Sequence, residues 1–510
     1  MYLSGRRLAA ADVPGLQKEQ EEKRGRFKMA VLESLEPQKV FQFFEEICQI
    51  PRGTFDTKRI SDYCVAFAKE RELEVIQDEA NNVIIRKPGT KGYESCEPVI
   101  LQGHLDMVCE KTAGSSHDFK TDGLDLYIED GYLRAKDTTL GSDNGIAVAM
   151  AMAILDSKDI PHPPIEALFT VDEEDGMGGA HAVDLSVLKG RKLINIDSEE
   201  EGILTTGCAG GIQYETILPV SKEKRSGMLM TVRIHGLLGG HSGAEIHKQR
   251  GNSNKMAGRL LYRIAKECTL NLVGINGGTK DNVITLDTTA EFLIPEGQGE
   301  AVSGKVQEME KIWVDEFMGE EPGLKVDVSS AAVTDCEVLD DASTERVIAY
   351  LMLCPNGLQE FSRKLEGVVE TSLNLGILET RDDGVRTVFQ IRSSVETRKH
   401  QLKEQLEQCA KVTGGEGRIT GEYPAWQYDP NSELRQIMVD TYKELYGEEP
   451  VVSAIHAGLE CGLFLGKRPD LDCVSFGPNL KDVHSVNEAL DLESTKRSWE
   501  YLKAVLKNCK

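Results

Sequence analysis

The sequence predicts an α/β fold with a mixed, mainly parallel sheet that is interrupted by an inserted α+β segment. Three apolar runs carry this prediction, and each ends in acidic or imidazole side chains: residues 99–106, 168–174 and 192–197. Such runs are typical of strands that are buried on both faces of a sheet. Residues 143–155 are apolar or small on nearly every face, which predicts a helix buried against that sheet.

The segments on either side of these runs extend the α/β prediction. Before the first run we expect two helices and then two strands, at 40–50, 57–72, 73–77 and 82–87. After residue 197 apolar and polar residues begin to alternate, which predicts strands with one solvated face. A buried α/β pattern returns only at 474–477. An inserted domain is the simplest explanation of this return.

Composition restricts the function classes. The 510 residues carry a net charge of −25, which argues against nucleic acid or an anionic membrane surface as a partner. We see no transmembrane segment in the sequence. The 12 cysteines contain no CxxC pair, since the closest two are Cys461 and Cys473. A structural zinc pair and a disulfide framework are therefore not expected, and a reducing cytoplasm fits best.

Several of the candidate site residues lie at predicted strand ends. His104 and Asp106 form an HxD pair whose side chains share one face, so that the Asp can accept the second imidazole N–H. Glu173 and Glu174 are adjacent and precede a glycine-rich turn. Neighbours on a strand point in opposite directions, so one carboxylate can bind a metal while the other acts as a base. A solvated acidic run is the alternative.

Three further residues complete the predicted cluster. Asp197 ends the third apolar run, and His484 comes from the returning C-terminal segment. Asp143 precedes the buried helix, where it is either a simple helix N-cap or a metal ligand. Ligands collect at the carboxyl ends of parallel strands, and crowded carboxylates repel one another unless a cation lies between them. A divalent metal centre is the expected result.

Six motifs occur in an order and spacing that resemble the co-catalytic dizinc exopeptidases, and within them the aminoacyl-histidine dipeptidases: GHLDMV, LGSDNGI, DEEDGMGG, INIDSEE, GGHSG and GPNLKDVHS. The resemblance covers residues 29–510. It implies two Zn²⁺ ions per subunit, with Co²⁺ or Mn²⁺ as alternatives. The implied ligands are a bridging Asp143, His104 with Asp197 at one ion, and Glu174 with His484 at the other.

The resemblance also implies roles for residues around the metals. Asp106 would orient His104, and Glu173 would be the general base that deprotonates a metal-bridging water. The peptide bond from Asp143 to Asn144 would be cis. The expected domain organisation begins with a disordered N-terminal extension at 1–28. A catalytic domain in two parts, 29–210 and 421–510, would then enclose a lid domain of two α+β subdomains at 211–420.

The lid is expected to contribute substrate contacts. His241 in GGHSG would stabilise the oxyanion, although a turn histidine in a glycine-rich loop is the alternative. Asn282 and Arg392 resemble the family's lid contacts, with Arg392 gripping the substrate's C-terminal carboxylate. Gly458, in a loop of the C-terminal segment, would permit a close backbone approach.

The expected protein is a cytoplasmic dipeptidase that hydrolyses unblocked dipeptides and prefers Xaa-His, including β-alanyl-histidine. Its partners would be small dipeptides, with a homodimer as one way to close the lid. The enzyme alternatives are a tripeptidase or an N-acyl amino acid deacylase on the same fold. A non-catalytic binding homologue should have lost a ligand or the base, and neither is missing. A dinuclear phosphatase or nuclease would need basic groups for phosphate.

Overall fold

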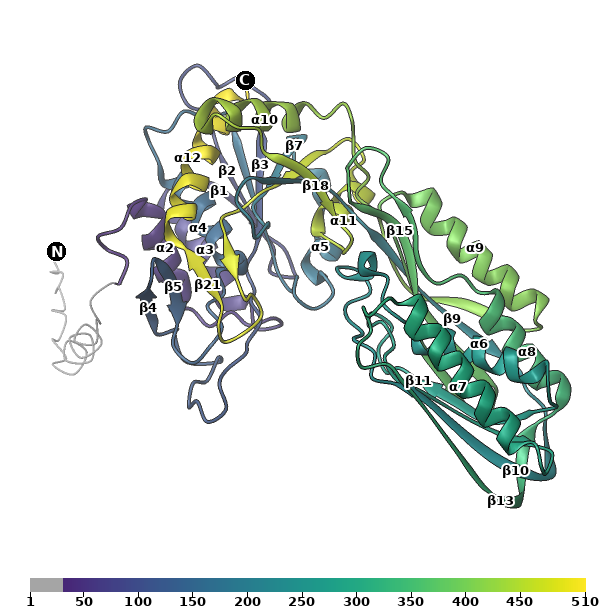
Figure 1. Ribbon diagram of the computed structural model, residues 1–510. Coiled ribbons are helices and arrows are strands. Elements are labelled where there is room, and N and C mark those ends of the chain that lie inside the picture. Colours follow the sequence, from purple (N-terminus) through teal and green to yellow (C-terminus); the bar gives the residue numbers. More distant parts are fainter. Residues whose placement is uncertain (1–30) are drawn as a thin grey trace, which may run out of the picture.

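The computed structural model describes residues 31–510, and these form two lobes (Figure 1). Segments from both ends of the described chain build the first lobe, and the middle of the chain builds the second. The α/β fold with an inserted α+β part is thereby confirmed. The predicted extension at 1–28 lies outside the described residues. No helix of the described part is both long and apolar enough to cross a membrane.

The first lobe is built on an eight-stranded sheet of order β1-β2-β6-β3-β7-β19-β8-β18. Its strands are β1 (Glu74–Gln77), β2 (Val83–Lys87), β3 (Val99–His104), β6 (Ile165–Thr170), β7 (Lys192–Asn195), β8 (Ile203–Cys208), β18 (Val451–Ile455) and β19 (Asp472–Ser475). The central strands β6, β3, β7 and β19 are parallel, whereas β1 and β2 are antiparallel. The sheet is therefore mixed and mainly parallel at its centre.

Helices cover both faces of this sheet. They are α2 (Gln38–Cys48), α3 (Lys58–Glu70), α4 (Ser142–Asp156), α5 (Gly178–Ala182), α10 (Glu433–Tyr446), α11 (Glu460–Lys467) and α12 (Leu492–Asn508). On β3, Val99 and Leu101 pack into the core with α2 and α4, whereas Ile100 packs into the core with α5 and α11. Both sides of β3 are thus buried, which explains its continuous apolar sequence.

The second lobe contains a nine-stranded sheet of order β13-β10-β12-β11-β15-β16-β9-β17, with β14 paired to β15. Its strands are β9 (Gly210–Leu218), β10 (Lys222–His235), β11 (Asn271–Gly277), β12 (Thr288–Ile294), β13 (Lys325–Leu339), β14 (Gly357–Phe361), β15 (Val369–Thr380), β16 (Val385–Ser393) and β17 (Glu416–Tyr423). Its helices are α6 (Ser253–Ala265), α7 (Gly299–Glu316), α8 (Asp341–Leu353) and α9 (Glu396–Val412). Two groups of strands meet where β11 pairs with β15 over only two residue pairs, and they share one hydrophobic core.

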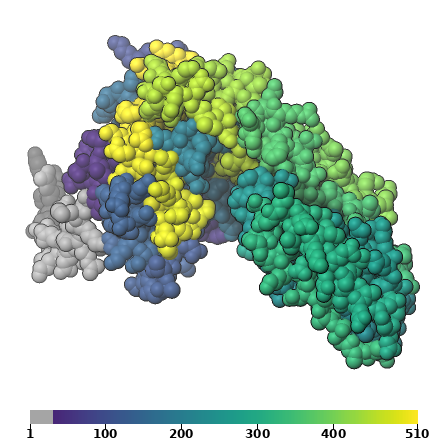
Figure 2. Space-filling model, in the orientation of Figure 1, coloured from purple at the N-terminus to yellow at the C-terminus, as the bar shows by residue number. Residues whose placement is uncertain are grey.

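A small third sheet brings the C-terminal segment to the first lobe. Its order is β20-β21-β5-β4, with β4 (Leu126–Glu129), β5 (Tyr132–Ala135), β20 (Leu480–Lys481) and β21 (Ala489–Asp491). The connection between β20 and β21 carries His484 and Glu488. Figure 2 shows that the two lobes meet at one end and are separated by a hollow toward the other.

Candidate metal centre

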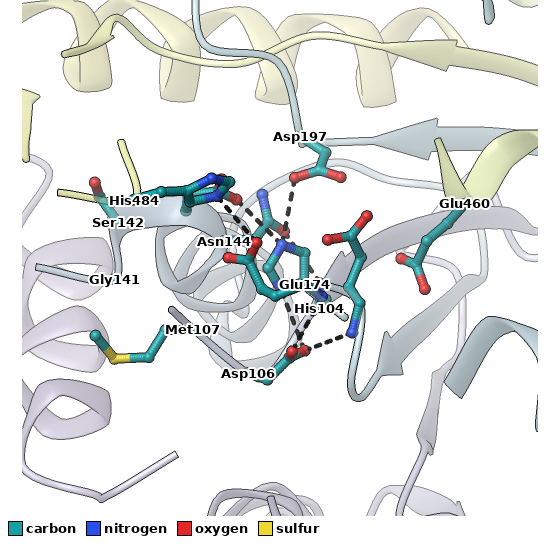
Figure 3. Close-up of polar contacts among 12 residues, drawn as sticks. His104, Asp106, Met107, Gly141, Ser142, Asn144, Glu174, Asp197, Glu460 and His484 are labelled. Atoms are coloured by element: carbon teal, nitrogen blue, oxygen red, sulfur yellow. Dashed lines mark hydrogen bonds and ion pairs between the residues drawn. The ribbon is translucent and has the colours of Figure 1, made fainter. Parts of the chain in front are cut away.

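The candidate centre lies where the parallel strands β3, β6 and β7 end. His104 is the last residue of β3, and Asp197 follows β7 by two residues. Because these strands run in parallel, their carboxyl ends meet at one edge of the sheet. Figure 3 shows the side chains of His104, Glu174, Asp197 and His484 gathered at this edge. The structure brings these four side chains together, as the sequence predicted, and their roles as metal ligands stay a prediction.

Two groups of three potential ligands share Asp143. The ligand atoms of His104, Asp143 and Asp197 lie within 4.8 Å of one another, and so do those of Asp143, Glu174 and His484. Asp143 Oδ1 lies 3.1 Å from His104 Nε2, and its Oδ2 lies 3.2 Å from His484 Nε2. Imidazole nitrogens and carboxylate oxygens suit Zn²⁺ and similar divalent ions. The side chains present therefore fit two ions bridged by one aspartate.

The cluster concentrates titratable groups that shift one another's pKa. Contacts with Asp143 and Glu174 raise the pKa of His484 to about 11. Burial opposes ionisation of Asp143, yet the hydrogen bonds to His104 and His484 hold its pKa well below the usual range. Burial raises the pKa of Asp197 well above its usual range, and nearby carboxylates add to this. A cation between these carboxylates would relieve their repulsion.

The loop before Asp143 is held by a carboxylate that sequence reasoning missed. Glu488 is buried and accepts the backbone N–H groups of Leu140, Gly141 and Ser142, at 2.8–2.9 Å. The peptide bond between Asp143 and Asn144 is cis, as the resemblance implied. The N-cap position of α4 is Gly141, and the two carboxylate oxygens of Asp143 contact His104 Nε2 and His484 Nε2, so the simple N-cap interpretation of Asp143 is wrong.

Asn144 connects the ends of β3 and β7 through two hydrogen bonds. Its Oδ1 accepts the His104 N–H at 3.2 Å, and its Nδ2 donates to the Ile196 carbonyl at 2.7 Å. Arg52, also buried, donates to the carbonyls of Leu105 and Asp106. These contacts keep the strand ends at fixed spacing.

Asp106 contacts three site residues at once. Its Oδ1 lies 3.4 Å from His104 Nδ1, as the HxD pattern predicted, and it also accepts the Glu173 N–H at 3.1 Å. Its Oδ2 accepts the N–H of Glu174 at 3.3 Å and the Thr54 hydroxyl at 3.0 Å. Although burial opposes it, the contact with His104 lowers the pKa of Asp106. Asp106 therefore positions the imidazole and both glutamates through these contacts.

Glu173 and Glu174 do not lie on a strand. Strand β6 ends at Thr170, and the two glutamates belong to the turn that follows it. The expected reason for their opposite directions, strand alternation, is therefore wrong, because the chain turns at Asp172, whose φ is 54°. Burial, together with the nearby Glu460 and Glu174, raises the pKa of Glu173 to about 8.

Glu460 is the second buried carboxylate that sequence reasoning missed. It begins α11 and is 1% exposed, and its Oε2 accepts bonds from Gln102 Nε2 at 2.6 Å and from the Thr170 hydroxyl at 2.8 Å. Figure 3 shows it on the opposite side of the cluster from His484. The only signal in the sequence is an acidic residue at the start of an otherwise apolar helix.

The lid residue His241 lies in a loop of the second lobe, where its orientation is defined. Its Nδ1 accepts the backbone N–H groups of Gly243 and Ala244, at 3.3 and 3.0 Å. The proton of the neutral ring is therefore on Nε2. Burial, followed by the nearby Arg392, lowers the pKa of His241. The ring is thus a neutral donor, and the predicted oxyanion role requires such a donor.

The other expected lid contacts lie around Arg392. This residue is 6% exposed and donates from Nη1 to the Tyr423 hydroxyl at 2.9 Å, while its buried Nε has no hydrogen-bond partner among residues 31–510. A Cβ on Gly458 would lie 3.0 Å from the Tyr423 ring, so the close approach at this glycine is to Tyr423. The Asn282 carbonyl accepts the Ser242 N–H at 2.8 Å and so stabilises the His241 loop, where His241 and Val283 form an isolated β-bridge. Its side-chain role stays a prediction.

The comparisons with known proteins agree with this geometry. The sequence profile of Peptidase family M20/M25/M40 matches residues 100–508. The chain is 38% identical to the cytosol non-specific dipeptidase of Escherichia coli strain K12 over 481 residues, which cover 94% of this chain and 99% of that protein. The crystal structure of aminoacylhistidine dipeptidase from Vibrio alginolyticus matches with a TM-score of 0.89 and 37% identity, covering 95% of this chain and 99% of that one.

A more distant structure shares the fold. The aminopeptidase PepT from Bacillus cereus matches with a TM-score of 0.53 at 17% identity, covering 93% of this chain and 99% of that one. The family resemblance inferred from the six motifs is confirmed by the profile and by the two relatives of similar length. The chain belongs to Peptidase family M20/M25/M40 and is a metallopeptidase.

Proposed function

We propose that the protein is a cytoplasmic dipeptidase that hydrolyses unblocked dipeptides, with a preference for a C-terminal histidine, including β-alanyl-histidine. The observation that carries the proposal is the pair of ligand groups that share Asp143, with the half-buried Glu173 next to the ligand Glu174. The names of the two similar relatives, a cytosol non-specific dipeptidase and an aminoacylhistidine dipeptidase, support the substrate class and the compartment.

The five ligands are those named in the sequence analysis: His104, Asp143, Glu174, Asp197 and His484. Two Zn²⁺ ions held by these residues would polarise the scissile carbonyl and lower the pKa of a bound water, and Co²⁺ or Mn²⁺ could replace them. Asp106 keeps His104 and the two glutamates in position.

Glu173 is the general base of the proposed reaction. Its carboxylate takes a proton from the attacking water and later delivers it to the leaving amine. His241 Nε2–H donates to the developing oxyanion, and Arg392 binds the C-terminal carboxylate through its planar fork. Asn282 and Gly458 complete the substrate contacts. Both lid donors lie on the lobe formed by residues 211–420, so the lobes must approach each other during turnover.

A dipeptide panel on the purified, metal-loaded protein tests this function. We expect hydrolysis of Ala-His, Gly-His and β-alanyl-histidine, with little hydrolysis of the tripeptide Ala-Ala-His or of N-acetyl-histidine. Faster cleavage of the tripeptide would favour a tripeptidase, and cleavage of N-acetyl-histidine would favour a deacylase. Absence of hydrolysis for all substrates in a protein that binds two metal ions would favour a non-catalytic homologue.

A further inference from the structure

One carboxylate oxygen of the buried Glu460 makes no hydrogen bond to the described residues. Both hydrogen bonds of this side chain, from Gln102 and Thr170, are made to Oε2. Its Oε1 is buried and has no hydrogen-bond partner among the described residues. A buried carboxylate oxygen without a donor is costly, so such an atom at a reaction site points to a ligand that supplies the donor.

The negative charge around Glu460 favours a cationic ligand. Glu460 lies at the same edge of the sheet as the carboxylates of Glu174 and Asp197 (Figure 3). Two dications bound by three ligand carboxylates would keep one net positive charge, whereas Asp106, Glu173 and Glu460 add three negative charges beside them. The site would then carry excess negative charge, which a cationic group of the substrate would reduce, and no Lys or Arg contacts Glu460 among the described residues.

A dipeptide has a cation of the required kind. Its α-amino group has a pKa near 8 and is mostly protonated at neutral pH. Glu460 enters from the first lobe, on the opposite side of the cluster from His484, whereas the carboxylate-binding Arg392 belongs to the second lobe. With the scissile carbonyl at the metals, the two ends of the substrate would then face opposite charges.

Building on the proposed dipeptidase function, we propose that Glu460 Oε1 binds the amino-terminal ammonium group of the substrate and so selects peptides with a free amino terminus. Glu460 is therefore a specificity-determining residue, distinct from the base Glu173 and from the metal ligands. Gln102 and Thr170 position it by occupying Oε2, which leaves Oε1 for the substrate.

The test compares Ala-His with propionyl-histidine, which is the same molecule without the amino group. The variant is Glu460→Gln, because an amide oxygen can keep both bonds from Gln102 and Thr170 while its NH₂ replaces Oε1. Asp175→Asn is the matched control, since Asp175 is an exposed carboxylate in the neighbouring turn. Metal content and thermal unfolding are measured for each protein, and kcat and KM for each substrate.

We expect Glu460→Gln to lower kcat/KM for Ala-His by at least about 30-fold, mainly through KM, and for propionyl-histidine by less than about threefold. Equal losses for both substrates would show that Glu460 only supports Gln102 and Thr170, and would overturn the proposal, as would no loss for either. If the Gln variant does not fold, Glu460→Asp must still affect Ala-His more than propionyl-histidine. A wild-type protein that cleaves no dipeptide would instead refute the proposed function.

Discussion

The two lobes present opposite chemistry to the space between them. The site residues of the first lobe are mainly hydrogen-bond acceptors, with Asp143, Glu173, Glu174, Asp197 and Glu460 gathered at the strand ends. The site residues of the second lobe are donors, because Arg392 has a free Nε–H and His241 carries its proton on Nε2. An acceptor-rich surface binds cations, whereas a donor-rich surface binds anions.

The two lobes also differ in whether their site groups already have hydrogen-bond partners. Asp106, Glu488 and Asn144 hold the first-lobe cluster from behind through hydrogen bonds that are already made. In the second lobe, the buried Arg392 Nε and Ser242 Oγ have no hydrogen-bond partner among residues 31–510. All five predicted metal ligands lie on the first lobe, whereas the unpartnered groups of the second lobe would be completed by the proposed substrate. First-lobe variants should therefore change metal binding or the chemical step, and second-lobe variants should change substrate use at constant metal content.

The largest effect should come from Asp143→Ala. Asp143 is the one residue that both ligand groups share, so its loss should remove both metal ions and reduce hydrolysis to background. Elemental analysis and a dipeptide assay on the same preparation measure both. Retention of two ions with good activity would contradict the bridging assignment.

Glu173→Gln should separate metal binding from chemistry. The amide keeps the size of the side chain and removes the proton acceptor, so we expect kcat to fall by about 10²–10⁴-fold at unchanged metal content. The Asp175→Asn variant, which alters an exposed carboxylate two residues away, should remain close to wild type. Near-normal turnover of the metal-loaded Gln variant would rule out Glu173 as the base.

Arg392→Ala should reveal the contribution of the second lobe. Losing a buried, charge-assisted contact costs about 2–5 kcal/mol, so kcat/KM for Ala-His should fall by about 30-fold or more while metal content stays the same. KM should rise and kcat should fall together, since carboxylate binding also favours closure of the lobes.

The C-terminal amide of Ala-His gives the complementary substrate for this variant. Wild type should cleave the amide slowly, and Arg392→Ala should treat the acid and the amide alike. Arg398→Ala, which removes a half-exposed arginine on α9, is the matched control. Equal wild-type rates on the acid and the amide would show that carboxylate recognition at Arg392 is wrong.

Glu488→Gln should weaken the first-lobe site without touching a ligand. The amide NH₂ would face backbone N–H groups that now donate to the carboxylate, so the loop before Asp143 would shift. Outer contacts of this kind are worth about 10–100-fold in metal affinity, and we expect a loss in that range. Competition with a chelator of known affinity measures it. An unchanged affinity would mean that the loop keeps its position without Glu488.

The smallest effect concerns pH and a contact between the two lobes, made by His456 in the first-lobe loop between β18 and α11. His456 Nε2 lies 2.7 Å from the Ser372 hydroxyl, and burial, followed by the nearby Arg392, lowers the pKa of His456 to about 3. An unfolded histidine has a pKa near 6.5. As pH falls below that value, the unfolded chain binds a proton that the folded chain does not, so folding stability is lost with decreasing pH.

His456→Gln should reduce this loss, by at most about 1.4 kcal/mol per pH unit. Urea unfolding of wild type and variant between about pH 7 and pH 5 measures the difference in slope. His400→Gln, on the exposed side of α9, provides the control. Parallel slopes for wild type and His456→Gln would show that His456 already binds its proton in the folded protein.

Much of the first lobe was predictable from the sequence because its signals are local. The apolar runs at 99–106, 168–174 and 192–197 became β3, β6 and β7, since continuous hydrophobic segments are buried wherever they lie in the chain. The meeting of their ends follows from parallel pairing alone. The turn at Glu173 and Glu174 was not predictable in this way, because a positive φ at a single aspartate ended the strand early.

The sequence by itself determined the fold class, the order of the motifs and the residue types that gather at the strand ends. Only the tertiary structure decided which groups surround them. Glu488 accepts a hydrogen bond from Leu140, which lies 348 residues before it in the sequence. Gln102 donates to Glu460, which lies 358 residues after it. Arg392 donates to the hydroxyl of Tyr423, and backbone N–H groups in the loop of His241 fix the tautomer of its ring. Contacts of this kind leave no periodic pattern in the chain, because they depend on how separate elements are packed against one another.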